Sequence, residues 1–318
     1  MNTDIKVSEL KHRFDKDFTP SQEYLKSMPD LQNSDFVGEP INFVGIHDFK
    51  LPIRIEEKSG GSQEVTASIS GTVSLDALNR GINMSRIIRT FYKSKDDIFN
   101  IDRLGKVLEN YCDDLDSFEA RILMNFEYRI WQEALRSVKE NGEKEGGWQF
   151  YNITFDAHMN KKHGFKKVMW IDFVYSSACP CSTALSEHAA YSRGVYGIPH
   201  SQRSVARIGI AFEKLVWIED VIEACRKALN TETLVFCKRQ DEQAFAEANG
   251  ANPKFVEDAI RFLSVEIDKL DGVYDYKIIC SHLESLHSHN AIAVKIKGVS
   301  HSSFNSTVTI DELKSLVR

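Results

Sequence analysis

The sequence lacks any run of about 18 apolar residues, the length that a membrane-spanning helix needs. Its polar first residues, 1–17, also lack the apolar core of a secretion signal. Basic residues are not in excess, because 40 Lys and Arg face 46 Asp and Glu, whereas nucleic-acid-binding proteins usually carry a basic surplus. These absences predict a cytoplasmic protein with no membrane or nucleic-acid partner. A small anionic ligand stays possible, since it needs only a local basic cluster.

Cysteine, glycine and proline are also scarce. Six cysteines among 318 residues are too few for a disulfide framework. Four of them stand singly in apolar stretches and are predicted to be buried thiols: Cys112, Cys225, Cys237 and Cys280. Cys179 and Cys181 differ, because they flank a single proline in a Ser-rich stretch. With 42% hydrophobic residues, the chain has enough apolar side chains for a large core.

Apolar residues alternate with polar ones in several short stretches, which is the period-two pattern of half-buried strands. The clearest stretch is 65–75, and the glycines of 59–62 predict a hairpin turn to a strand at 53–58. Further strands are predicted at 148–157, 166–176, 206–212, 276–283 and 290–298.

Helical spacing is predicted around Met84–Ser94, Leu115–Lys139 and Trp217–Leu229, and a further helix starts at Asn252 and Pro253. Residues 1–40 are polar and are expected to form an arm before a catalytic domain of residues 41–318. The element order predicts an α+β fold of two tandem modules, about 41–178 and 203–300. Each module is expected to be an antiparallel sheet with helices packed on one face.

The most distinctive motif is the Cys-Pro-Cys at 179–181, which follows a predicted strand. Thiolates bind soft or borderline metals, and the end of a strand exposes them. Two ordinary loop cysteines are the alternative.

A second motif, His200-Ser-Gln-Arg203-Ser, stands where the next strand begins. Histidine serves as a metal ligand or proton shuttle, and arginine binds phosphate through two parallel donors. Alone, such a motif is usually a set of solvent-exposed residues without a functional role.

The segment 232–259 mixes acidic and basic residues. Glu232 is a candidate ligand, Lys238 and Arg239 are candidate phosphate contacts, and Glu247 is a candidate acceptor for a guanine edge. A solvated helix with salt bridges is the alternative for each of them.

Between the last two predicted strands lie Glu284, His287 and His289. In an extended segment the two histidines share one face and form a candidate metal pair, whereas a turn separates them as solvated loop residues.

In this order, these segments resemble the type IB GTP cyclohydrolases over most of the chain. The resemblance rests on the segments 28–32, 44–53, 179–182, 200–204, 238–242, 249–259 and 284–291. It implies the tunnelling fold and a homotetramer with active sites at subunit interfaces. The connection from Thr183 to Pro199, which contains His188, is expected to be a loop and is longer than in shorter family members.

The resemblance also implies an activity and a set of site residues. The activity is metal-dependent hydrolysis of GTP by water to 7,8-dihydroneopterin triphosphate and formate, the first step of folate and pterin biosynthesis. Cys179, His200 and Glu232 correspond to ligands of a zinc, manganese or iron ion, and Glu247 to the guanine anchor. The remaining assignments are Cys181 and His287 for proton handling, Glu284 in support, and Arg203, Lys238 and Arg239 for the triphosphate.

Two other functions fit parts of the pattern. A nitrile reductase of a related tunnelling fold would use a cysteine nucleophile and NADPH. A non-catalytic binding protein would instead close a structural zinc site with Cys179, Cys181, His287 and His289.

Overall fold

The computed structural model of the chain describes residues 14–31, 38–94 and 96–298, together with Phe304, Thr309, Glu312 and Leu316. The predicted arm of residues 1–40 is therefore described only in part. Its described part contains the exposed helix α1 (Gln22–Ser27), whose first turn is capped by Ser21. Across these ranges, none of the helices has the length and apolarity required to cross a membrane.

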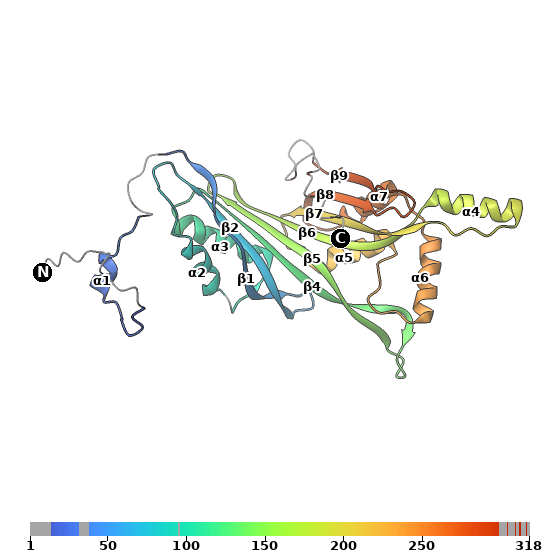
Figure 1. The fold of residues 1–318 in the computed structure, drawn as a ribbon, viewed down its shortest axis with the longest axis horizontal. Helices are drawn as coiled ribbons and strands as arrows, with labels where there is room; N and C mark the ends of the chain where they lie inside the picture. Colours follow the sequence, from blue (N-terminus) through green and yellow to red (C-terminus); the bar gives the residue numbers. More distant parts are fainter. Residues whose placement is uncertain are drawn as a thin grey trace.

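The strands of the described residues form one continuous nine-stranded sheet in the order β3-β1-β2-β4-β5-β6-β7-β8-β9 (Figure 1). Neighbouring strands are antiparallel, except that β1 and β3 are parallel. The strands are β1 (Ile41–Glu56), β2 (Ser62–Leu75), β3 (Ile98–Phe99), β4 (Glu119–Val138), β5 (Lys144–Asn160), β6 (Gly164–Ala178), β7 (Ser201–Phe212), β8 (Val273–His282) and β9 (Ala291–Ile296).

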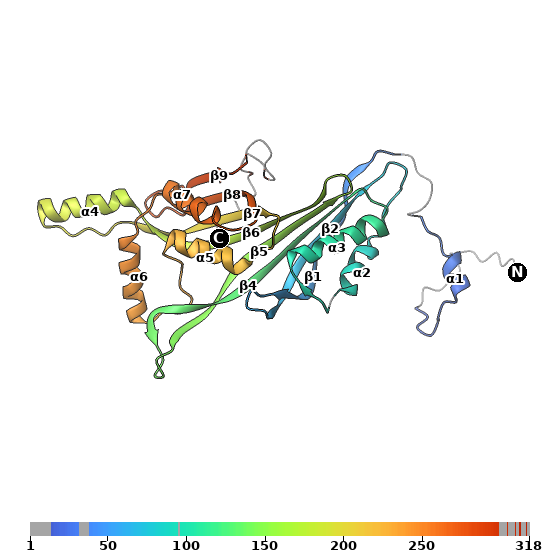
Figure 2. The same ribbon diagram turned by 180° about the vertical axis from the view of Figure 1, so that it is seen from behind.

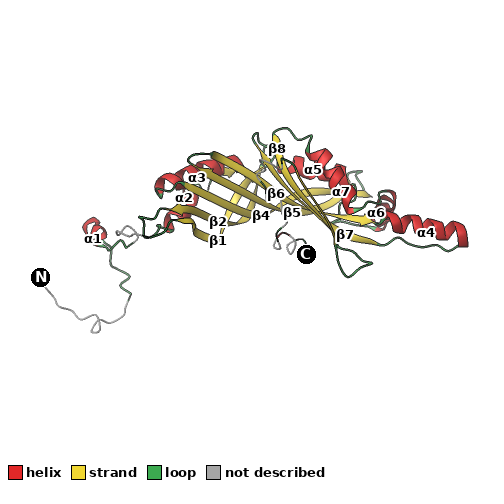
Figure 3. Ribbon diagram, turned by 90° about the horizontal axis from the view of Figure 1, so that it is seen from above, coloured by secondary structure: helices red, strands yellow, loops and turns green. Residues whose placement is uncertain are grey.

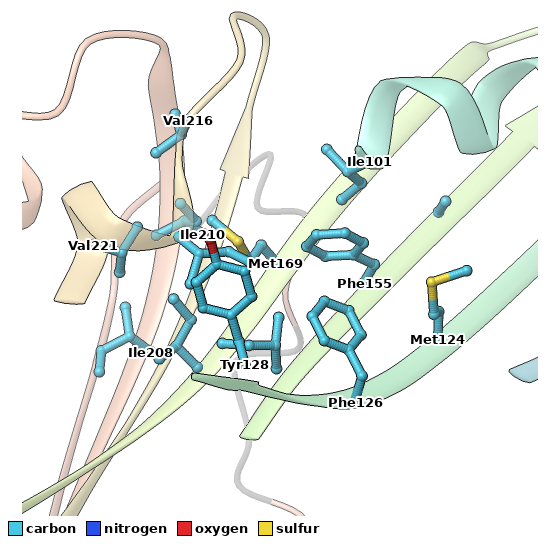
Figure 4. Close-up of a cluster of buried hydrophobic side chains, with 14 of the residues drawn as sticks. Ile101, Met124, Phe126, Tyr128, Phe155, Met169, Ile208, Ile210, Val216 and Val221 are labelled. Atoms are coloured by element: carbon cyan, nitrogen blue, oxygen red, sulfur yellow. The ribbon is translucent and has the colours of Figure 1, made fainter. Parts of the chain in front are cut away.

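Four helices cover one face of this sheet, as Figure 3 shows: α2 (Ser85–Lys93), α3 (Ile101–Asp114), α5 (Ile218–Leu229) and α7 (Val256–Ile267). Their apolar sides and the alternate strand residues facing them share a single buried cluster. Figure 4 shows part of it, where Ile101 of α3, Phe126 of β4 and Val221 of α5 approach the same group of side chains. The predicted α+β class, with an antiparallel sheet and helices on one face, is confirmed.

The prediction of a helix over Leu115–Lys139 is wrong, because this segment is mostly the long strand β4. The apolar residues Ile122, Phe126 and Ile130 recur every four residues, and four residues are both about one helical turn and two full strand repeats. Met124 and Tyr128 decide between the two, since both are buried on the same side as Ile122 and Phe126. The second helix is instead α3, which the sequence pattern missed.

The order strand, strand, helix, helix, strand, strand occurs twice, first in β1-β2-α2-α3-β4-β5 and then in β6-β7-α5-α7-β8-β9. The short strand β3 and two further helices, α4 (Pro180–Arg193) and α6 (Arg239–Ala251), are additional to the repeat. By element order the repeat divides between β5 and β6. The module limits 41–178 and 203–300 stay a prediction.

Two local predictions need correction. Asn252 and Pro253 do not begin α7: its N-cap is Phe255, and Asn252 is the C-cap of α6. Cys237 is exposed, whereas Cys112, Cys225 and Cys280 are buried as predicted. Cys237 follows the segment 231–236, whose first residues pair antiparallel with the end of β6.

Candidate active site

The two motif segments meet where β6 ends and β7 begins. Ala178 pairs with Ser201, and one step further the Cys179 backbone N–H donates to the His200 carbonyl at 3.2 Å. Antiparallel pairing thus places Cys179 beside His200, although 20 residues separate them along the chain. Glu284, two residues beyond the end of β8, lies close to the same point, with its Oε2 3.7 Å from His200 Nδ1.

Cys179 is the N-cap residue of α4, and Pro180 occupies the first turn, a position that suits proline because that turn has no intrahelical acceptor for its N–H. The predicted loop from Thr183 to Pro199 is therefore wrong over most of its length. The helix ends at Gly194, which adopts the left-handed conformation with φ 65°. No residue of α4 is buried, so the helix has no apolar stripe by which its sequence could reveal it. Figure 2 shows it projecting from the body of the fold.

The two thiols differ in exposure: Cys179 is partly covered and Cys181 is exposed in the first turn of α4. Ser182 in the same turn accepts a hydrogen bond from the backbone N–H of His200 at 3.2 Å. The α4 start is therefore attached to the β7 start by two hydrogen bonds. Cys179 and His200 are therefore held next to each other and form one unit, the Cys179 and His200 unit.

A buried polar network lies behind His200, and sequence reasoning missed it. Gln202 and Ser177 are hydrogen bonded at 3.0 Å, and Ser177 lies 2.9 Å from Ser204 Oγ and 3.3 Å from His282 Nδ1. On its other side, His282 Nε2 lies 2.9 Å from the Tyr175 hydroxyl. These side chains stand on neighbouring strands and together satisfy polar groups that water does not reach.

His282 is an uncharged histidine at neutral pH. Its burial, together with the positive charge of Lys254, lowers the pKa of His282 to about 4. Burial likewise lowers the pKa of Lys254 to about 8. The only sequence signal for His282 was its register on β8, which puts it on the same face as Ile278 and Cys280.

Glu232 lies apart from the Cys179 and His200 unit within this chain. Its residue forms an isolated bridge with Tyr175, and its carboxylate accepts hydrogen bonds from Arg226 Nε at 2.8 Å and from the Tyr151 hydroxyl. It lines a cavity of about 480 Å³ together with Trp131 and Phe245. Among the described residues, no three His, Cys, Asp or Glu side chains lie close enough to hold a metal ion.

The predicted substrate contacts are distributed over two places. Arg203 is exposed on β7, near the Cys179 and His200 unit. Lys238 is the N-cap of α6 and pairs with Glu145 at 2.7 Å, and Arg239 is exposed beside it. Glu247 lies further along α6, where its half-exposed carboxylate pairs with the Arg136 guanidinium of β4.

Asp241 joins the first turn of α6 to β4, and no sequence pattern indicates this role. Its buried carboxylate accepts hydrogen bonds from the backbone N–H groups of Arg136 at 2.7 Å, Ser137 at 2.9 Å and Lys238 at 3.0 Å, and from the Ser137 hydroxyl. Burial alone would raise the pKa of Asp241, but these donors outweigh it and lower the pKa well below its ordinary value of 3.8.

His287 and His289 lie in the bend that follows β8. Both are exposed, and their rings stack with centroids 4.9 Å apart. The two side chains thus lie side by side, as the predicted H-x-H pair requires. No third metal-binding side chain joins them among the described residues.

Comparison with known proteins gives one consistent result. The family model described as type I GTP cyclohydrolase folE2 matches residues 28–293. GTP cyclohydrolase FolE2 of Roseobacter denitrificans (strain ATCC 33942 / OCh 114) is 44% identical over 302 residues, which are 92% of this chain and 80% of that protein. The protein of the same name from Paracoccus denitrificans (strain Pd 1222) is 44% identical over 308 residues, 94% of each chain.

Among solved structures, uricase from Arthrobacter globiformis aligns with 86% of this chain and 97% of its own, at a TM-score of 0.48 and 9% identity. A similarity this low does not bear on function. The family match and the relatives, which cover most of the chain, identify the family. The chain belongs to the type I GTP cyclohydrolase folE2 family.

Proposed function

We propose that this chain opens the guanine ring of GTP by hydrolysis, releasing formate and giving 7,8-dihydroneopterin triphosphate for folate biosynthesis. Membership of the family makes it a GTP cyclohydrolase, a hydrolase. The observation that supports the site is the pairing of Cys179 with His200 at the ends of β6 and β7, with Glu284 beside them. Cytoplasmic location is part of the proposal.

The donors at this point suit a metal ion. A thiol, an imidazole and a carboxylate are the ligand types that zinc accepts at catalytic sites, and manganese or iron also binds such a set. We propose Cys179 and His200 as two of the ligands and Glu232 as the third. A bound divalent ion would supply Lewis acidity and lower the pKa of water toward neutrality.

The other polar residues are proposed to bind and orient GTP and to move protons. Glu247 would accept the N1–H and 2-amino hydrogens of guanine, while Arg203, Lys238 and Arg239 would contact the triphosphate. Cys181 in the first turn of α4 and His287 in the bend after β8 are exposed and would exchange protons with the reacting ring, with Glu284 beside His200.

We propose a homotetramer with active sites at subunit interfaces. Within one chain Glu232 is held by Arg226 and Tyr151 and does not join Cys179 and His200 in a group of three metal-binding side chains among the described residues, which supports a site that a second subunit completes. Binding GTP would also require Glu247 to exchange its Arg136 partner for guanine.

The test of the function is an assay of purified full-length protein loaded with zinc, manganese or iron. With GTP we expect equimolar formate and a fluorescent pterin after oxidation, whereas ATP is rejected because its N1 is an acceptor and its 2-amino group is missing. No turnover with any of the three ions would contradict the proposal. NADPH oxidation with a deazaguanine nitrile would instead identify a nitrile reductase.

Two carboxylates compete for the place of third ligand, and metal analysis of the variants separates them. We expect Glu232→Gln to weaken metal binding, because it removes the proposed ligand, and Glu284→Gln to leave metal content near that of the wild type. Metal content and affinity would be measured by mass spectrometry and by competition with a chelator. The reverse result, with loss of metal in Glu284→Gln alone, would assign the third position to the carboxylate that already lies 3.7 Å from His200.

A further inference from the structure

Gln202 connects the candidate ligand His200 to the buried network behind it. It is almost fully buried on β7, two residues after His200, so the two side chains stand on the same side of the strand. Its Oε1 lies 3.2 Å from His200 Nδ1, and its Nε2 donates to Ser177 Oγ at 3.0 Å. One amide thus contacts the imidazole with its oxygen and the network with its nitrogen.

The surroundings of His200 Nδ1 favour a proton on that nitrogen. An amide oxygen can only accept a hydrogen bond, and so can the Glu284 carboxylate, whose Oε2 lies 3.7 Å from the same nitrogen. Two acceptors therefore face Nδ1. In the neutral ring Nε2 then carries the lone pair, and it makes no hydrogen bond to any described residue.

The Ser177 hydroxyl is the partner of the Gln202 amide nitrogen, and the network around Ser177 sets how that hydroxyl is used. The hydroxyl accepts from Gln202 Nε2 and has a single proton, which it can give to Ser204 Oγ at 2.9 Å or to His282 Nδ1 at 3.3 Å. Ser177 and Ser204 are fully buried, so water cannot supply alternative partners. A flipped amide would turn its NH₂ group toward His200 and its oxygen away from the imidazole proton.

We propose that Gln202 is a positioning residue that keeps His200 in the tautomer with the proton on Nδ1, so that Nε2 is available as a metal ligand. Groups that hydrogen bond to the second nitrogen of a ligating histidine fix its tautomer and ring orientation. The inference rests on the proposed ligand role of His200, but the tautomer itself belongs to the protein without metal.

The first measurement is ¹⁵N NMR of histidine-labelled, metal-free, full-length protein, with the His200 signals identified by their loss in His200→Gln. The wild type should show a protonated Nδ1 and an unprotonated Nε2. Gln202→Ala should give a mixture of both tautomers, because the one acceptor left facing Nδ1, Glu284, lies 3.7 Å away, beyond hydrogen-bond distance. Gln202→Glu, which keeps an acceptor oxygen, should restore the wild-type pattern. An unchanged His200 signal in Gln202→Ala would overturn the proposal.

The second measurement is the affinity of each variant for zinc, by competition with a chelator. Gln202→Ala should bind zinc about 10- to 100-fold more weakly, and Gln202→Glu should recover most of the affinity. Gln63→Ala is the matched control, because Gln63 is also buried and hydrogen bonded but lies on β2 and bonds to Arg129. An equal loss in the control would mean general loosening of the fold and would also overturn the proposal.

These readouts separate the inference from the function on which it rests. If the wild type fails to convert GTP while Gln202 still controls the tautomer and zinc affinity, the function is wrong and the positioning role stands. If the wild type converts GTP while zinc affinity and tautomer are the same in Gln202→Ala, the function stands and the positioning role is wrong.

Discussion

Replacing Cys179 by alanine is expected to abolish the conversion of GTP and to lower the bound metal. The substitution removes a thiolate from a proposed three-ligand site, and alanine offers no donor in its place. We expect kcat/KM to fall by at least about 1,000-fold, equivalent to about 4 kcal/mol of lost transition-state stabilisation. Metal content by mass spectrometry and formate release would be measured on the same preparation.

The matched control is Cys181→Ala, in the same helical turn. We assign Cys181 to proton handling, so this variant should turn over GTP slowly while it keeps its metal and binds GTP. Full metal occupancy in Cys179→Ala would remove Cys179 from the ligand set. Normal turnover in Cys181→Ala would show that the second thiol is dispensable.

The second large effect is expected for Asp241→Asn, which should release α6 from β4. An amide keeps one acceptor oxygen but turns two N–H hydrogens toward the backbone donors of Arg136, Ser137 and Lys238. Amide hydrogens of α6 should then exchange with solvent about tenfold faster or more. Hydrogen–deuterium exchange followed by mass spectrometry would locate the change. GTP turnover should fall too, because α6 carries Glu247.

The pH dependence gives a second measure of the same contact. Because the folded pKa of Asp241 is lowered, its stabilisation is complete above the ordinary value of 3.8 and is lost as the pH falls below it. The wild-type α6 should therefore loosen in acid, and Asp241→Asn should already be loose at neutral pH. Asp258→Asn is the control, since Asp258 occupies the same helical position in α7 but accepts from only one backbone N–H, that of Phe255. Equal exchange of α6 in wild type and Asp241→Asn would refute the assignment.

Strands in which apolar and polar residues alternate without ambiguity were predicted correctly from the sequence. The strand at 65–75 alternates strictly, and its alternate apolar residues are buried as expected. The sequence of β4 indicates a helix because its most conspicuous apolar residues recur every four positions, which suits both structures. α4 was missed for the opposite reason, because a helix without buried residues needs no apolar periodicity.

The site was predictable to the extent that one hairpin joins its parts. β6 and β7 are consecutive antiparallel strands, so the motifs at the end of one and the start of the next must meet. His282, Gln202 and Asp241 were not predictable, because each acts through partners on other strands or helices. The position of Glu232 beside Arg226 likewise depends on how the segment after α5 pairs with the end of β6.

α4 and the non-helical residues 194–200 that return to β7 form a projecting excursion between the two motifs. Its two ends are held together by two hydrogen bonds, from the Cys179 N–H to the His200 carbonyl and from the His200 N–H to the Ser182 hydroxyl. Lengthening a closed loop costs little, about 0.6 kcal/mol for each doubling. The number of residues between the two motifs can therefore vary while the Cys179 thiol and the His200 imidazole stay next to each other. Their distance along the sequence carries no information about their distance in space.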